Sequence, residues 1–442
     1  MFPAWDFNSE FEKGDLRKAL ETLQHKDNLA NGRARFIYYA NNGLLLSVLG
    51  KYEESNEYFE KAFLFGEEYH VNYVYEAASY FTNPNVTVYR GEDHEHLMVL
   101  YFKAINYLKM NKPEQALVEC RRLNIRLNQL SDKYASENKY QRDAFVHVLM
   151  GIIYQSTKDY NNAFIAYRNA VEVYEDDYTR MFDMQVPGQL KKDLLNTAWW
   201  IGFHEEFELF KTKFEMPDYQ APLPGSELVF FWHNGLCPVK SEWSINFAID
   251  RRDQNTFVFT NQNLGIAFPF HVEEKDRGDL SKIEVFRVAF PRYLERPQYF
   301  QSAMLEVDSS QYMLERAEDI NKIAFHSLRE RMMMEFSKGL LRVALKKATE
   351  YSVKKENDGL GALIGVMNAI TEKADTRNWQ TLPHTIHYAR VPMKEGKNEV
   401  KFTINADQEH ADYNFTYQAA QNQTLFHTFS SLETSYGPAR PY

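Results

Sequence analysis

Cysteine is nearly absent from this chain of 442 residues, which contains only Cys120 and Cys237. Two cysteines cannot build a disulfide scaffold or a thiolate zinc site, and they leave the redox compartment open. Cys120 falls on the apolar side of a helical repeat, where we expect a small core residue. Long hydrophobic runs are also missing. The longest begins at Gly359 and has about a dozen residues, whereas a helix that crosses a bilayer needs about 20.

Basic residues are fewer than acidic ones. Lys and Arg number 51 against 61 Asp and Glu, which gives a formal net charge of −10. A surface of this sign repels phosphate backbones, so we expect no nucleic-acid partner. One segment gathers five basic residues, but they alternate with apolar residues at helical spacing, which predicts a solvated helix face. They are Arg329, Arg331, Arg342, Lys346 and Lys347.

Aromatic residues, in contrast, are abundant. With 28 Tyr and 32 Phe, the chain has ample material for burial, because large rings cover much area per residue. Its length exceeds one ordinary core and predicts two domains. We place a helical repeat domain at 1–215, a Pro-rich linker at 216–225, an α+β domain at 226–432 and a tail at 433–442.

Four segments of the first half share one pattern, and they start at the turn residues Gly14, Gly50, Asn111 and Lys158. A small residue follows each turn after five positions: Ala19, Ser55, Ala116 and Ala163. A larger residue comes four positions later: Leu23, Phe59, Cys120 and Tyr167. Three repeats also carry a small residue seven positions before the turn: Gly43, Ala104 and Gly151. This spacing matches the tetratricopeptide repeat, in which two antiparallel helices cross closely at small residues. A helical capping unit follows around Pro187.

The interval between the second and third repeats contains the sequence TNPNVTVYRGEDHEH. Insertions in repeat arrays often carry function, so Glu92, His94, Glu95 and His96 form a candidate partner-binding loop. A metal site that adds Asp93 is the alternative. However, the helix dipole alone favours acidic residues at the start of a helix. In addition, the two histidine side chains of a His-x-His sequence point to different sides of a helix. We therefore predict no metal here.

The second half changes period after the linker. Its first segment, from Glu227 to Ile249, predicts two strands around an Asn-Gly loop. Further strands are expected at NLGIAFPF, KIEVFRVAF, SAMLEV and QTLFHTF, and a hairpin at HTIHYARVPM and NEVKFTIN, across KEGK. Apolar spacing of three and four predicts a long helix over 312–355 and another over 359–374.

The segment DTRNWQTLPHTIHYAR (375–390) has the richest chemistry of the chain. As an active site it would offer Asp375 as base, Arg377 as an oxyanion clamp and either His384 or His387 as acid. As a structural corner, Asp375 and Arg377 would pair with each other or with exposed carbonyls, and Trp379 would be an apolar anchor. We favour the corner and keep Asp375, Arg377, Trp379 and His384 as a candidate polar cluster. No nucleotide fingerprint or serine-elbow motif is present, so we assign no cofactor and no catalytic residue.

Several landmarks of the second half occur together: NGLCPVKSE, AFPRY, ERAEDINKIAFHSL and ADTRNWQTLPHTIHYARVPMKEGKNEV. With YRGEDHEHLMVLYFKAINYL, they resemble an uncharacterised family of bacterial envelope lipoproteins with tetratricopeptide-like repeats. The resemblance covers roughly residues 30–405. It implies a lipid-anchored protein on the periplasmic face of the envelope, with other envelope proteins as partners, and it implies no reaction.

The first residues, MFPAWDFNSEF, have neither the basic nor the apolar part of a signal peptide, and the first repeat is short. We expect residues upstream, including the lipid-modified cysteine that the resemblance implies. If Met1 is the true start, a cytoplasmic protein is the alternative.

The sequence therefore predicts a non-enzymatic scaffold or accessory subunit of a cell-envelope assembly, related to the outer membrane or to peptidoglycan, that binds partners through its repeats. The alternative is an enzyme or ligand-binding protein that acts on cell-wall material, with a pocket in the second domain. The oligomeric state stays open.

Overall fold

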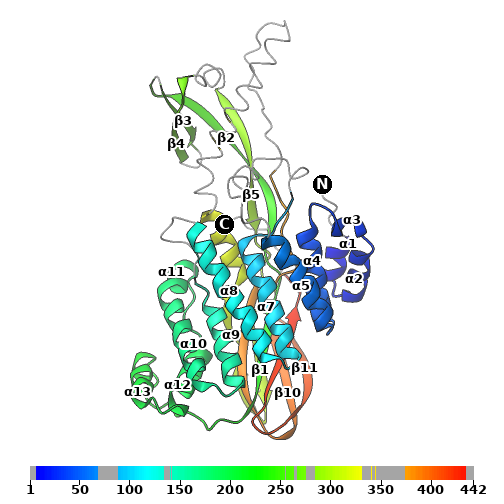
Figure 1. The fold of residues 1–442 in the computed structure, drawn as a ribbon, viewed down its shortest axis with the longest axis vertical. Coiled ribbons are helices and arrows are strands. Elements are labelled where there is room, and N and C mark those ends of the chain that lie inside the picture. The colour runs from blue at the N-terminus through cyan, green and yellow to red at the C-terminus, as the bar shows by residue number, and fades with distance from the viewer. Residues whose placement is uncertain are drawn as a thin grey trace.

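The computed structural model describes residues 6–67, 88–133, 140, 142–253, 255–262, 266–274, 284–330, 340, 344 and 374–434. Within these ranges the chain is helical up to Lys213 and consists mainly of strands from Ser226 onward (Figure 1). The predicted fold class, a tetratricopeptide-like helical array followed by an α+β domain, is confirmed.

Antiparallel helix pairs form the first half. A short pair, α1 (Asp6–Glu12) and α2 (Leu16–Gln24), comes first, followed by the single turn α3 (Asp27–Ala30). Four inner helices follow in the described chain: α4 (Arg35–Val48), α7 (Asp93–Lys109), α9 (Ala144–Ser156) and α12 (Gly188–Trp200). Their outer partners are α5 (Tyr52–Glu67), α8 (Pro113–Lys133), α10 (Tyr160–Val173) and α13 (His204–Lys213). A π-helical segment (Tyr174–Tyr178) and α11 (Thr179–Phe182) extend α10.

The small residues of the repeat pattern lie where paired helices cross. A Cβ atom on Gly43 would lie 2.6 Å from the Phe59 ring, and one on Gly151 would lie 2.3 Å from the Tyr167 ring. The Ser55 hydroxyl donates to the Gly43 carbonyl at 2.6 Å. Larger residues at these positions would push the paired helices apart, so the spacing in the sequence encodes the close crossing.

Three four-stranded sheets make up most of the described part of the second half. The central sheet has the order β12-β1-β9-β8, with β1 (Ser226–Asn234), β8 (Glu315–Asp319), β9 (Thr385–Met393) and β12 (Thr424–Ser431). The far sheet has the order β11-β10-β6-β7, with β6 (Ser302–Val307), β7 (Ser310–Met313), β10 (Gly396–Asn405) and β11 (His410–Ala419). The projecting sheet has the order β4-β3-β2-β5, with β2 (Val239–Arg251), β3 (Thr256–Asn261), β4 (Ile266–His271) and β5 (Val285–Leu294), and extends away from the helices (Figure 1).

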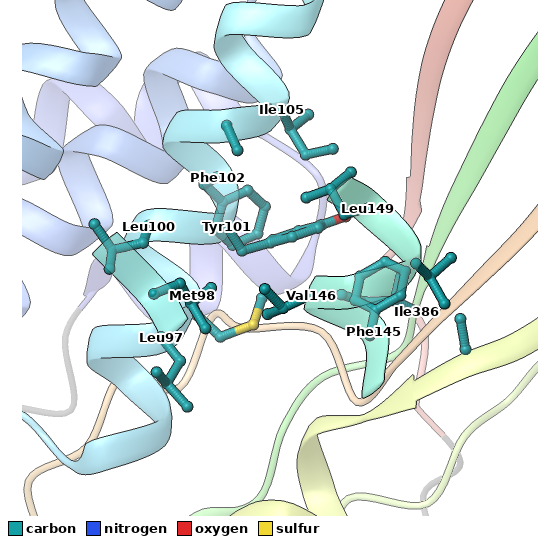
Figure 2. Packing of buried hydrophobic residues seen from close by; sticks show 14 of the residues in the cluster. Leu97, Met98, Leu100, Tyr101, Phe102, Ile105, Phe145, Val146, Leu149 and Ile386 are labelled. Carbon is teal, nitrogen blue, oxygen red and sulfur yellow. The ribbon is translucent and has the colours of Figure 1, made fainter. Parts of the chain in front are cut away.

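The central sheet is buried on both faces. Along β1, Val229 and Phe231 belong to the core of the helical array, whereas Phe230 and Trp232 pack with the far sheet. Successive side chains of a strand point to opposite faces, so this alternation places the sheet between two layers. Figure 2 shows the helical side of this core, where side chains of α7 and α9 pack beside Ile386 of β9.

One hydrophobic core therefore runs through both predicted domains. It also includes Leu236, Ala317 and Trp379, and the linker residue Tyr219 packs against it. The division at 216–225 marks a change of secondary structure, but the halves on either side are packed together. We call the contact between the inner helices and the second half the seam.

Two predictions for the second half were wrong. The helix predicted from residue 312 begins at Ile320, because β7 and β8 occupy the residues before it. An irregularity in the β8 register between Arg316 and Glu318 breaks the strand alternation, so that Leu314, Ala317 and Ile320 acquire a helix-like spacing of three.

The predicted hairpin of β9 and β10 does not form either. Strand β9 pairs with β1 on one edge and β8 on the other, so it has no edge left for β10. Strand β10 instead pairs with β6 and β11 in the far sheet. The other predicted strands are confirmed as β1, β2, β4, β5, β6 and β12. The helix predicted over 359–374 lies outside the described residues except for Ala374. Of the five basic residues of the predicted helix face, Arg329 lies within the described residues and the other four lie outside them.

Candidate functional site

Each of the four inner helices makes a polar contact across the seam. The contacts are Thr381 to Asn41 of α4 (2.6 Å), Tyr101 of α7 to His233 (2.8 Å), Gln155 of α9 to Glu227 (3.4 Å), and Arg390 to Asp193 of α12 (3.1 Å). The inner face of the array, which is the concave binding surface in many repeat proteins, is therefore covered by the chain's own second half. Two groups of polar side chains dominate this seam.

The structure brings the two predicted candidate sites together in the first group. The Trp379 backbone N–H donates to Glu95 Oε1 at 2.6 Å, and the Tyr89 hydroxyl donates to Glu95 Oε2 at 2.7 Å. Lys240 pairs with Glu92. We call Glu92, Glu95, Lys240, Asp375 and Arg377, with the groups that they bind, the α7 cluster. It joins the start of α7 to the segment that contains Trp379.

Glu92, His94, Glu95 and His96 do not form an exposed loop, which corrects the prediction. Glu92 is the N-cap of α7 and the other three lie in its first turn, and all four are buried. Glu95 accepts a hydrogen bond from the Glu92 N–H in a capping box, so the acidic spacing is a helix start. The rings of His94 and His96 face Tyr293 and Phe36, respectively. Side chains enclosed in this way cannot touch a partner.

Asp375 and Arg377 pair with each other, as the structural-corner interpretation expects. The Arg377 Nε atom donates to Asp375 Oδ1 at 2.8 Å, and Nη1 donates to the Arg33 carbonyl at 3.2 Å. Trp379 is fully buried, with its ring 6.1 Å from that of Phe59. Neither candidate acid joins this pair. His384 Nδ1 lies 3.1 Å from the Arg296 carbonyl, and His387 Nε2 lies 3.0 Å from the Thr385 hydroxyl. The residues proposed as base, clamp and acid therefore do not converge on an open site.

Burial governs the charges in this region. It raises the pKa of Glu95 to about 7, with the Glu92 carboxylate adding to the rise, whereas Lys240 and the backbone N–H groups oppose it. Burial also lowers the pKa of His94 to about 3 and lowers that of His384. Both histidines are therefore neutral near pH 7. A carboxyl with a pKa near 7 can hold or release a proton, but Glu95 is enclosed.

Cys237 and His233 do not form a nucleophilic pair. The Cys237 thiol lies 3.2 Å from the Trp379 carbonyl, and burial raises the pKa of this thiol to about 12. His233 contacts the Tyr101 hydroxyl, and burial lowers its pKa to about 3. Thiolate chemistry needs a lowered thiol pKa, so this arrangement fits a packed core cysteine.

The second polar group was missed by the sequence analysis. The Arg390 guanidinium lies between two carboxylates, with Nη1 2.6 Å from Glu227 and Nε 3.1 Å from Asp193, and Nη2 donates to the Tyr167 hydroxyl at 2.8 Å. Tyr388 also donates to Asp193, at 3.3 Å. We call these residues the Arg390 cluster. The available signal was a charged residue on the same face of the strand as Ile386 and Tyr388.

A cavity of about 290 Å³ opens beside the Arg390 cluster. It lies between α12, the linker and the ends of β1, β9 and β12, so both halves of the chain form its walls. Trp200 and Tyr160 form an aromatic wall, with ring centroids 5.0 Å apart, and the Trp200 indole N–H donates to the Pro222 carbonyl at 2.7 Å. Lys158 and Lys192 lie among its lining residues. This volume is close to the lower limit for small-molecule sites.

In the described part of the chain, no three His, Cys, Asp or Glu side chains come together in a way that could hold a metal ion. A search of the helices in the same ranges finds none that is both long enough and apolar enough to span a membrane.

Comparisons with known proteins concern the helical half. The tetratricopeptide repeat family matches residues 146–177, which include most of α9 and all of α10. A search of curated proteins finds no match to the chain. Solved structures with similar regions include the apo form of RapI (14% identity, TM-score 0.36), which covers 47% of this chain and 50% of that one. They also include BtubC from P. vanneervenii (15%, TM-score 0.34, 49% and 80%) and MamA from Desulfovibrio magneticus RS-1 (16%, TM-score 0.30, 48% and 90%). This chain thus spans about half the length of RapI. The helical half is a tetratricopeptide-like repeat array.

Proposed function

We propose that this protein is a non-enzymatic scaffold or accessory subunit of a bacterial cell-envelope assembly, and that its partner proteins bind the outer helices of the repeat array. The observation that carries the proposal is that the two helices of each pair have different surroundings. The inner helices are covered by the chain's own second half, whereas the outer helices face solvent.

Each outer helix exposes at least one large aliphatic side chain. These residues are Leu64 on α5, Val118 and Ile125 on α8, Ile165 on α10, and Leu209 on α13. Val118 and Ile125 are seven residues apart, so they lie on the same side of α8. Ile125 and Leu209 are 57% and 63% exposed, respectively. Exposed apolar side chains on each outer helix give a protein partner surface to cover.

The envelope location rests on the sequence resemblance described above. We propose from that resemblance that the protein lies on the periplasmic face of the envelope, held by a lipid anchor. The scaffold role is further supported by the α7 cluster, in which Lys240 pairs with Glu92 across the seam and so helps to hold the two halves together.

Affinity purification of the tagged full-length gene product from native membranes tests this proposal. We expect a stoichiometric envelope protein that is lost when Val118 and Ile125 are both changed to Lys. Met313→Lys is the matched control, since Met313 is 54% exposed on strand β7 of the second half. The proposal fails if the protein is recovered alone, if partners stay bound to the Val118→Lys/Ile125→Lys variant, or if fractionation finds the full-length product in the cytoplasm.

A further inference from the structure

We propose that the cavity beside the Arg390 cluster binds an acidic sugar, that is, a pyranose ring that carries a carboxylate. This inference is independent of the proposed scaffold role, which uses the outer helices. It rests on three features of the cavity: its enclosure by both halves of the chain, two lysines without ion-pair partners, and an aromatic wall among spare amide groups.

Both halves of the chain hold the cavity open. The Trp200–Pro222 hydrogen bond fixes the linker against the end of α12, and the Tyr219 hydroxyl donates to Asn196 Oδ1 at 2.8 Å. Beneath them, Arg390 ties Asp193 of α12 to Glu227 of β1. These bonds stabilise the walls of a space that the packed residues leave empty, so the cavity is pre-formed, as small-molecule sites usually are.

Lys158 and Lys192 give the cavity a positive rim. Both side chains are exposed, and within the described ranges neither ammonium group has a carboxylate partner or a hydrogen bond. Many other lysines of this acidic protein are paired, such as Lys103, Lys213 and Lys240. Two unpaired ammonium groups at one cavity attract an anion, and the carboxylates of the Arg390 cluster are already engaged below them.

The walls offer what a sugar ring needs. The rings of Tyr160 and Trp200 provide flat apolar faces for the C–H groups of a pyranose. In the described structure, the Asn196 amide N–H groups, the Gln189 amide carbonyl and the whole Asn422 amide have no hydrogen-bond partner, so they can bind ligand hydroxyls. An acidic sugar would place its ring hydroxyls against these amide groups and its carboxylate against the two lysines. A fatty acid would leave the amides unpaired.

Isothermal titration of the full chain with D-glucuronate tests the inference, with D-glucose as the neutral control of the same ring. We expect glucuronate to bind and to quench tryptophan fluorescence, and glucose to bind about tenfold more weakly, since two exposed ion pairs contribute about 1–2 kcal/mol. The Lys158→Met/Lys192→Met variant should lose the same factor for glucuronate. Trp200→Phe should lose most of the fluorescence change.

The Lys51→Met/Lys112→Met variant is the matched control, because these two lysines are 54% and 45% exposed and do not line the cavity. Its affinity should equal that of the wild type. The inference is overturned if glucose binds as well as glucuronate, or if the Lys158→Met/Lys192→Met variant keeps full affinity.

A hyaluronan tetrasaccharide, which carries the same acid within a glycan, separates the two sources of such a sugar. Binding of the monosaccharide assigns the site to free sugar acids, and binding of the tetrasaccharide alone assigns it to glycan chains. If neither binds with a Kd below about 1 mM, the inference is wrong.

Discussion

The two polar clusters of the seam have similar chemistry and different surroundings. In the α7 cluster, carboxylates, Lys240 and Arg377 are enclosed by aromatic rings, and Arg377 lies 5.3 Å from the Tyr89 ring centroid. In the Arg390 cluster, a guanidinium is also paired with two carboxylates, but a cavity of about 290 Å³ lies beside them. Paired charges at a buried contact are therefore compatible both with a closed joint and with the floor of a binding site. The space beside them distinguishes the two.

The largest expected effect comes from Arg390, because this side chain compensates two carboxylates. Burial raises the pKa of Asp193, and Arg390 opposes that rise. We expect Arg390→Met to lower the free energy of unfolding by about 3–5 kcal/mol, since it leaves buried carboxylate charge unpaired. Urea unfolding followed by circular dichroism measures the loss.

Two further variants control for this result. Arg390→Lys keeps the charge but not the forked geometry, so its loss should be intermediate. Combining Asp193→Asn with Arg390→Met should recover part of the stability, because the unpaired charge is gone. A loss below about 1 kcal/mol for Arg390→Met would show that water reaches the carboxylates from the cavity and solvates them.

The comparison also shows where sequence reasoning succeeds. The repeat array was predictable because Gly43 and Gly151 report a local packing requirement against Phe59 and Tyr167, at fixed spacing. The pairing of Asp375 with Arg377 was predictable because the residues are two positions apart. The Arg390 cluster joins residues about 160 to 220 positions apart, and no local pattern specifies such a contact. The same applies to β9, whose neighbours on both edges are distant in sequence.

The next effect concerns pH and the α7 cluster. Because the folded pKa of Glu95 is raised to about 7, its contribution to stability is complete below about pH 4.5 and is lost as the pH rises through 7. The full difference is about 3 kcal/mol. Glu95→Gln removes this titration, although its amide loses a hydrogen bond at every pH.

The difference in unfolding free energy between wild type and Glu95→Gln should therefore shrink as the pH rises from 4.5 to 8. Taking the difference cancels His94 and His233, whose pKa values of about 3 have the opposite sign: their contributions are present above about pH 6.5 and are lost as the pH falls. Parallel curves for the two proteins would mean that Glu95 is ionised throughout, held by its three hydrogen-bond donors.

A smaller loss is expected at the corner. Arg377→Ala removes the hydrogen bonds to Asp375 and to the Arg33 carbonyl, but the Asp375 side chain is 16% exposed and can bind water. We expect a loss of about 1–3 kcal/mol in unfolding free energy, visible as a lower melting temperature. Asp375→Asn keeps the size and should lose less. If a defined activity disappeared while the melting curve stayed unchanged, the corner would be an active site.

The smallest effect separates a binding rim from a structural contact. Lys158 and Lys192 have no partner among the described residues, so the Lys158→Met/Lys192→Met variant should unfold within about 0.5 kcal/mol of the wild type. Its stability should also depend on salt as that of the wild type does, since no ion pair is lost. A clear destabilisation would show that the two ammonium groups offset the carboxylates of the Arg390 cluster through the cavity. The Arg390 cluster would then be a structural contact like the α7 cluster, and the two lysines would not be available to a ligand.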